Sequence, residues 1–89
     1  MEFEWDEAKR QSNLRKHQFD FYEAVTLFDG PHVITNARTV GAEPRFLATG
    51  LLRGGFATIV FTRRGPNIRV ISIRSARHVE QRGYQAVHS

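Results

Sequence analysis

The chain has 89 residues, of which 40% are hydrophobic and 25% are charged. This length leaves room for one small core, so residues 1–89 are expected to form a single globular domain. The absence of cysteine excludes a disulfide framework, a thiolate metal site and a cysteine nucleophile. The N-terminal stretch is acidic and no apolar run is long enough to span a membrane, which predicts a soluble, cytoplasmic protein.

The whole chain has a formal net charge of +4. The positive charge is concentrated in its C-terminal two-thirds. Residues 1–30 contain four basic and seven acidic residues, whereas residues 31–89 contain nine arginines and two glutamates. Eleven of the thirteen basic residues are arginine, whose planar guanidinium binds phosphate bidentately. This bias favours a nucleic-acid partner, although a basic surface that only keeps the protein soluble would have the same composition.

The first third of the sequence predicts a short strand and two helices. Residues 2–5 alternate between polar and apolar side chains, and Asp6 is a suitable N-cap for a polar helix that runs to His17. Asp20 and Glu23 form a capping-box pattern at the start of a second helix, over 20–29, with apolar residues on one face. Gly30 is expected to end this helix as a left-handed cap.

From residue 32 the hydrophobic period changes to two, which predicts strands. We expect them over 33–35, 45–52, 56–63 and 68–75, with glycine-containing turns at 53–55 and 64–67 and a final helix over 76–86. The fold class is therefore α+β: a short N-terminal strand, two helices, an antiparallel meander of three or four strands, and a C-terminal helix, with the helices on one sheet face. In the last strand Ile71 and Ile73 are expected to face the core, and Arg74 the open polar face.

Three basic clusters are candidates for a functional site, and each has an alternative reading as an ordinary charged turn or strand end. They are Arg15-Lys16-His17, Arg63-Arg64 with Arg69, and Arg74 with Arg77-His78. Arg74 stands out because an arginine inside a strand pattern needs a partner or an anionic ligand. The four histidines have no metal-ligand spacing, so no metal or other cofactor is expected.

A longer series of motifs resembles a known family. The residues that carry the resemblance are Phe3-Glu4-Trp5-Asp6, Asn13, Lys16-His17, Phe21, Glu23-Ala24-Val25, Phe28, Glu43, Arg45-Phe46, Gly50, Thr62, Arg64, Ile68-Arg69-Val70-Ile71-Ser72, Arg74, Ala76, Glu80 and Tyr84. In their order and spacing they resemble the BrnT family of bacterial type II toxins, the ribonuclease half of the BrnT–BrnA toxin–antitoxin pair. The resemblance spans nearly the whole chain.

The resemblance implies a RelE-like fold and metal-independent cleavage of RNA that stops translation. It also implies inhibition by a BrnA-like antitoxin with a DNA-binding domain, in a two-plus-two complex that represses its own operon. Such cleavage by the ribose 2′-OH requires a base, a cation for the phosphorane and an acid for the leaving oxygen.

Basic and titratable side chains of this sequence meet these requirements. Arg64 and Arg74 are expected to clamp the phosphate, and His17 to transfer protons with Lys16 as an electrostatic aid. Glu80 and Tyr84 are further candidate proton carriers. The expected RNA contacts are Arg15, Arg63, Arg69 and Arg77.

Two other function classes remain open at this stage. A non-catalytic nucleic-acid-binding module would display aromatic side chains for base stacking, whereas the face expected to be open here offers Thr and Arg. A protein-binding domain would use the basic surface to recognise an acidic partner, which is compatible with antitoxin binding.

Overall fold

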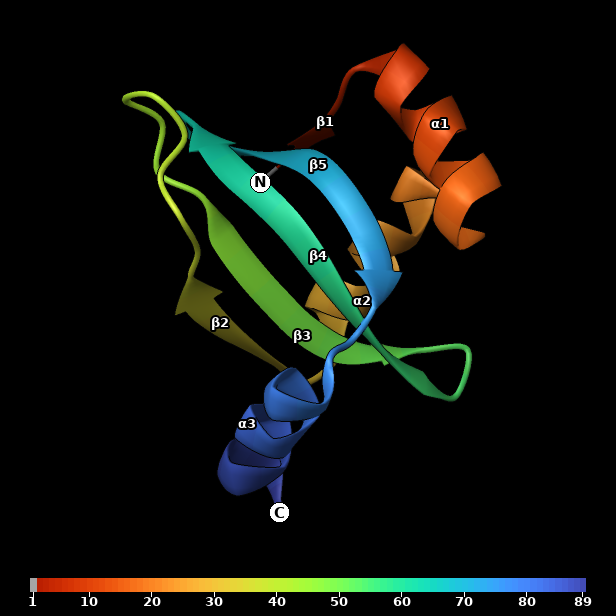
Figure 1. The fold of residues 1–89 in the computed structure, drawn as a ribbon, viewed down its shortest axis with the longest axis vertical. Helices are drawn as coiled ribbons and strands as arrows, with labels where there is room; N and C mark the ends of the chain where they lie inside the picture. The colour runs from red at the N-terminus through yellow and green to blue at the C-terminus, as the bar shows by residue number, and fades with distance from the viewer. Residues whose placement is uncertain (1) are drawn as a thin grey trace.

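A five-stranded sheet with the order β1-β5-β4-β3-β2 forms the centre of the computed structural model, which describes residues 2–89 (Figure 1). Strand β1 runs parallel to β5, and all other neighbouring strands are antiparallel. The elements in chain order are β1 (Phe3–Glu4), α1 (Glu7–His17), a 3₁₀ turn η1 (Phe21–Glu23), α2 (Ala24–Asp29), β2 (His32–Asn36), β3 (Phe46–Leu52), β4 (Gly55–Arg64), β5 (Asn67–Ser75) and α3 (His78–His88). The predicted α+β class is confirmed.

The caps predicted for the N-terminal helices are largely confirmed. The Asp6 carboxylate accepts a hydrogen bond from the Lys9 backbone N–H at the start of α1, and the Asp20–Glu23 capping box is present. The segment expected to be one helix over 20–29 is divided into η1 and α2. Gly30 is extended rather than left-handed, so that expectation was wrong; the left-handed cap belongs to α1, at Gln18 (φ 59°).

Two tight turns connect the last three strands, as predicted. Leu52 pairs with Gly55, and the two residues between them, Arg53 and Gly54, have φ of 52° and 78°. These values are typical of a type I′ turn, whose twist matches that of the flanking strands. Gly65, with φ 58°, makes the corresponding turn between β4 and β5.

The hydrophobic core lies between the sheet and the segment η1–α2. Phe21 and Leu27 pack there against Ile59, Phe61 and Ile73, all fully buried. Val60 pairs with Ser72 and the next residue, Phe61, pairs with Val70, so Ile71 is the extra, unpaired residue of a β-bulge in β5. As a result Val70 is buried with Ile73 while Ile71 is only half-buried, which corrects the prediction that Ile71 and Ile73 share the core face.

Asn13 connects α1 to the edge of β5. Strand β1 covers that edge only at Ile68 and Arg69. Further along, the Asn13 amide donates to the Ile73 carbonyl (2.9 Å) and accepts from the Ile73 N–H (3.1 Å). The side chain therefore satisfies buried backbone groups in place of a strand and fixes α1 beside the end of β5.

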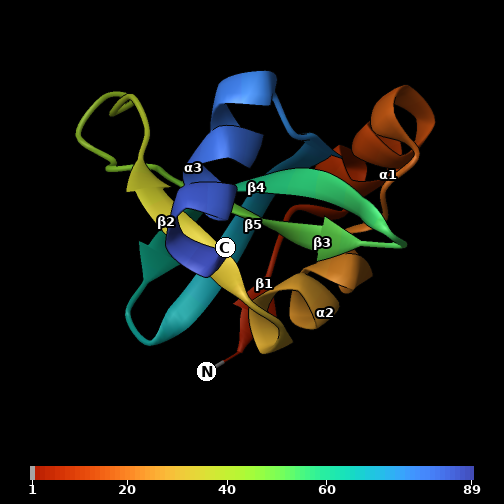
Figure 2. The ribbon, with the colours of Figure 1, turned by 90° about the horizontal axis from the view of Figure 1, so that it is seen from below.

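Helix α3 lies on the sheet face opposite to α2, which corrects the prediction that all helices share one face (Figure 2). The Tyr84 ring packs edge-on against Phe56, and the helix contacts β2 and β3. The face expected to be an open polar surface is therefore partly covered, and Thr49, Thr58 and Thr62 on it are buried.

Candidate active site

A bidentate ion pair between Arg74 and Glu80 joins the end of β5 to the first turn of α3. The Arg74 Nη1 and Nη2 atoms lie 2.8 Å and 2.9 Å from the two carboxylate oxygens of Glu80. Only 18% of the Arg74 side chain and 10% of the Glu80 side chain is exposed. Parallel charge-assisted hydrogen bonds of this kind fix the orientation of a guanidinium. Glu80 is therefore the partner that the position of Arg74 inside a strand led us to expect.

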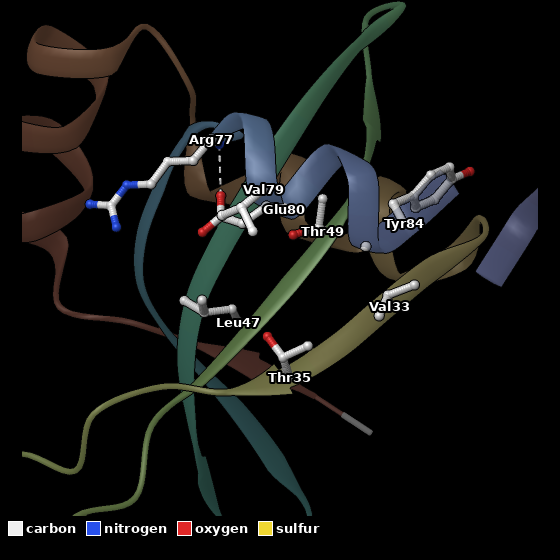
Figure 3. A pocket seen from close by; sticks show the side chains of 9 residues that line it. Val33, Thr35, Leu47, Thr49, Arg77, Val79, Glu80 and Tyr84 are labelled. Carbon is white, nitrogen blue, oxygen red and sulfur yellow. Dashed lines mark hydrogen bonds between the residues drawn. The ribbon is translucent and has the colours of Figure 1, made fainter. Parts of the chain in front are cut away.

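The Glu80 carboxylate accepts further hydrogen bonds from the Thr58 hydroxyl (2.9 Å) and from the Arg77 backbone N–H (2.8 Å; Figure 3). The Thr58 hydroxyl is in turn 2.9 Å from that of Thr49. The carboxylate thus closes the first turn of α3 and anchors the helix to β3, β4 and β5. The sequence pattern places Arg74 on the face that was expected to be open, and nothing in it indicates this chain of contacts.

The environment of Glu80 does not suit a proton donor. The hydrogen bonds from Arg74 lower the pKa of Glu80 to about 2, because they stabilise the ionised form more than burial opposes it. The carboxyl group is therefore ionised at neutral pH, with both oxygens occupied. This geometry favours a role for Glu80 in holding Arg74 rather than the predicted proton transfer.

Lys16 and His17 lie beside the end of β5, although more than fifty residues separate them from it in sequence. Together with Asn13 and Ser72 they line a hollow of about 190 Å³. His17 also lines a second hollow, of about 300 Å³, that extends to Phe56 and Ser75. The fold thus brings the basic end of α1 next to the β5 segment that carries Arg74.

Tyr84 is buried one helical turn beyond Glu80, and its ring contacts Phe56 and His88. Figure 3 shows the ring directed away from Glu80. The side chain of exposed Arg77 also extends away from the carboxylate that its backbone N–H contacts. The structure therefore does not bring the Tyr84 hydroxyl to the Arg74–Glu80 pair.

The second basic cluster lies at the other end of the β4–β5 pair. Arg64 pairs with Asn67 beside the turn, whereas Arg74 pairs with Thr58. Arg64 lies six positions after Thr58, which corresponds to about 20 Å along the strand. In the structure Arg64 contacts a different carboxylate, that of Glu43 (3.4 Å), so the predicted clamp of Arg64 and Arg74 on one phosphate is not assembled.

The remaining predicted RNA contacts are dispersed. Arg69 is bound to Glu4 (2.8 Å), and exposed Arg63 lies over the rings of Phe46 and Phe61. Arg15 is exposed on α1.

Within residues 2–89, no three His, Asp or Glu side chains lie close enough together to hold a metal ion. No helix of that range is both long and apolar enough to cross a membrane.

Comparison with known proteins identifies one family. A family model described as the ribonuclease toxin, BrnT, of a type II toxin–antitoxin system matches residues 5–80. A search of curated proteins finds no match to this chain. The matched range includes α1, the whole sheet from β2 to β5 and the Arg74–Glu80 pair.

Proposed function

The chain belongs to the BrnT family of ribonuclease toxins of type II toxin–antitoxin systems, and we propose that it cleaves RNA without a metal ion at the surface formed by Lys16, His17 and Arg74. The observation that carries the proposal is the position of Arg74, which is held by Glu80 and lies in β5 between Ser72 and Ser75, each of which lines one of the hollows that His17 also lines. Membership of the family supplies the substrate class and a protein antitoxin as partner.

Arg74 stabilises the negative charge that develops on the phosphate when the ribose 2′-OH attacks. A guanidinium has more N–H donors than the Glu80 oxygens and the Ser75 carbonyl engage, so some remain for a phosphate. The orientation of the group is set before substrate binds, which reduces the reorganisation needed in the transition state. Glu80 is a positioning residue in this mechanism, because it acts on the phosphate only through Arg74.

His17 takes the proton from the 2′-OH as the 2′-oxygen attacks phosphorus, and as the bond from phosphorus to the 5′-oxygen breaks, the protonated imidazole or a solvent water delivers a proton to that oxygen. It lies half-buried between the two hollows, where an RNA strand crossing the end of β5 would pass. Lys16 adds a second positive charge on the same surface. These charges are supplied by the chain itself, which is what a metal-free mechanism requires.

The arginines at the far end of the strand pair bind the RNA backbone away from the cleaved bond. Arg63 and Arg64 are both more exposed than Arg74, and about 20 Å of strand separates Arg64 from the cleavage surface. Arginine contacts to phosphate strengthen binding without a direct part in the chemistry. With exposed Arg15 and Arg77, this arrangement supports a binding track that is longer than one nucleotide.

We also propose that the antitoxin is BrnA-like, that two toxins and two antitoxins form the complex, and that the complex binds operator DNA through the antitoxin. Family membership supports a protein antitoxin. The molar mass of the co-expressed complex in solution tests the stoichiometry: any mass other than that of two copies of each chain contradicts it.

The test of cleavage uses a labelled single-stranded RNA and the purified chain, free of antitoxin, in EDTA. We expect cleavage with a 2′,3′-cyclic phosphate product, and a loss of about 100-fold or more in His17→Ala and in Arg74→Ala. Arg38→Ala, which removes an exposed charge from the loop before β3, is the matched control and should cut like the wild type.

Different failures contradict different parts of the proposal. Cleavage that stops in EDTA and returns with Mg²⁺ contradicts the metal-free mechanism. Cleavage that survives in Arg74→Ala contradicts the site. RNA binding that weakens steeply with salt, with no cleavage in any condition, leaves an electrostatic binding module as the function.

A further inference from the structure

An apolar groove lies between α3 and the sheet, on the sheet face opposite to the core (Figure 3). Its volume is about 350 Å³. Val33 and Leu47 line it from β2 and β3, and Val79 and Gly83 line it from α3. Glu80 lies at one end of the groove, so the groove borders the Arg74–Glu80 ion pair.

One face of α3 beside this groove carries exposed apolar side chains. Val79, Gly83 and Val87 follow one another at intervals of four, which places them on the same face of the helix. Val79 is 62% exposed and Val87 is 64% exposed. Solvated single valines are common, but Val79 lines an apolar groove and Val87 lies on the same helix face, and another apolar group can cover such a surface.

Gly83 is not explained by packing inside the chain. Glycine destabilises the interior of a helix relative to alanine. A Cβ atom built at Gly83 would meet nothing within 4 Å, in contrast to one at Gly50, which would lie 3.0 Å from the Pro31 carbonyl oxygen. The missing side chain therefore leaves room for an atom of another molecule rather than for a neighbour in this fold.

The surroundings of the groove favour a peptide over RNA. Strand β2, which carries Val33, is at the end of the sheet and pairs with β3 alone, so its outer edge has no strand partner within residues 2–89. Backbone groups at such an edge bind an extended peptide, and a neighbouring groove takes its alternate side chains. RNA is instead recognised by aromatic stacking and hydrogen bonds to base edges. The one aromatic side chain that lines the groove, Tyr84, is buried against Phe56 and does not offer a free ring face to a base.

The charge around the groove indicates the kind of peptide. Arg77 lines it and Arg82 is exposed on the same helix, while the acidic residue there, Glu80, is already paired with Arg74. Residues 31–89 carry nine arginines against two glutamates. A complementary segment therefore has acidic residues next to its apolar ones.

We propose that this groove binds the antitoxin through a segment of apolar residues flanked by acidic ones. The bound segment covers Arg77 and the outer side of Glu80, and so inhibits at the border of the cleavage surface. This inference rests on the proposed function, because it uses the antitoxin as the occupant and the Arg74 surface as the target of inhibition.

The experiment fills the groove with a larger side chain of the protein itself. Gly83→Trp places a large side chain where the structure has open space, and Gln85→Trp places the same side chain two residues away, on the other side of α3, as the matched control. Each purified variant is titrated with the antitoxin that is co-expressed from the shared operon. RNA cleavage by the free variants, alongside Arg74→Ala, is measured in parallel, and thermal unfolding confirms that each variant is folded.

We expect Gly83→Trp to weaken antitoxin binding by about 100-fold, the effect of losing a central contact of an interface, and to leave RNA cleavage unchanged. Gln85→Trp should leave both unchanged. Val79→Glu, which adds a negative charge beside the groove, should weaken binding by about tenfold. Arg74→Ala should lose cleavage but still bind the antitoxin.

Antitoxin binding at wild-type strength in both Gly83→Trp and Val79→Glu would overturn the proposal. Loss of RNA cleavage in Gly83→Trp with antitoxin binding intact would also overturn it, because the groove would then belong to the RNA site. If the wild type proves unable to cut RNA, the proposed function fails, yet weaker antitoxin binding by Gly83→Trp alone would still support the groove as the antitoxin site.

Discussion

Glu80→Gln removes the charge that holds Arg74 while keeping the shape of the side chain. The pKa of Glu80 falls from 4.5 to about 2 in the folded chain. A shift of that size corresponds to about 3 kcal/mol of stabilisation by the ionised carboxylate. Because an amide oxygen can still accept hydrogen bonds from Thr58 and Arg77, we expect Glu80→Gln to lose about 2–3 kcal/mol at pH 7. In a domain of this size, such a loss lowers the Tm by about 10–20 °C.

The pH dependence of unfolding separates this ionic contribution from a packing defect. The pKa of Glu80 is lower in the folded than in the unfolded chain, so its stabilising contribution is present above about pH 5 and disappears as the pH falls towards 2. Urea unfolding followed by circular dichroism should therefore show the wild type and Glu80→Gln converging between pH 5 and pH 2. Curves that stay parallel over that range would refute the reasoning.

Glu7→Gln is the control for this experiment. The hydrogen bond from Arg10 also lowers the pKa of Glu7 to about 2, but the Glu7 side chain is 57% exposed. Water and salt screen such a pair, so its effect on stability should be smaller and should vanish in high salt, whereas that of Glu80 should persist.

In RNA cleavage, Glu80→Gln should lower the rate without changing the shape of the pH profile between pH 5 and 8, because Glu80 does not titrate there. Disappearance of a limb of that profile would mean that Glu80 transfers a proton.

Three further predictions concern stability and RNA binding. Gly50→Ala should destabilise by about 1–3 kcal/mol through overpacking against Leu27 and Pro31, whereas Gly83→Ala should stabilise by about 1 kcal/mol, both measured by urea unfolding; the same sign at both positions would contradict the packing argument. Asn13→Ala should cost about 2–4 kcal/mol because it leaves buried backbone groups of Ile73 unpaired, which thermal unfolding would detect. Arg63→Ala should reduce the dependence of RNA affinity on log salt concentration by about one unit while leaving the cleavage rate of bound RNA unchanged.

Features set by neighbouring residues in the chain were predictable from the sequence. The Asp6 cap, the Asp20–Glu23 capping box and the turn at Arg53-Gly54 depend on local hydrogen bonds and on the backbone angles that glycine permits. Gly30 shows the limit of such reasoning, because glycine permits a left-handed cap without requiring one. The extended Gly30 leads directly into β2, and it is the path to the next strand that decides its conformation.

Features set by contacts between distant segments were not predictable. Ile71 lost its expected place in the core because it is the extra, unpaired residue of a bulge in β5 itself, between Val70, which pairs with Phe61, and Ser72, which pairs with Val60, and the two-residue period of a strand does not hold across a bulge. The position of α3 on the second sheet face depends on Tyr84 meeting Phe56 and on Glu80 meeting Thr58. For the site, the sequence indicated that Arg74 needs a partner, but the choice between Glu80 and a bound anion required the fold.

Glu80 lies between the two proposed binding sites, the RNA site at Arg74 and the antitoxin groove beside α3. Its carboxylate fixes Arg74 on one side and borders the groove under α3 on the other. An antitoxin that approaches through the groove therefore reaches the cleavage surface without occupying the whole basic face, and any change it makes in the Arg74–Glu80 contact alters the affinity for a phosphate. Coupling between two ligands is reciprocal. If bound antitoxin lowers the affinity for RNA by some factor, bound RNA must lower the affinity for the antitoxin by the same factor. A toxin already engaged with RNA is then harder to neutralise than a free one, and inhibition depends on antitoxin that is bound before the substrate arrives.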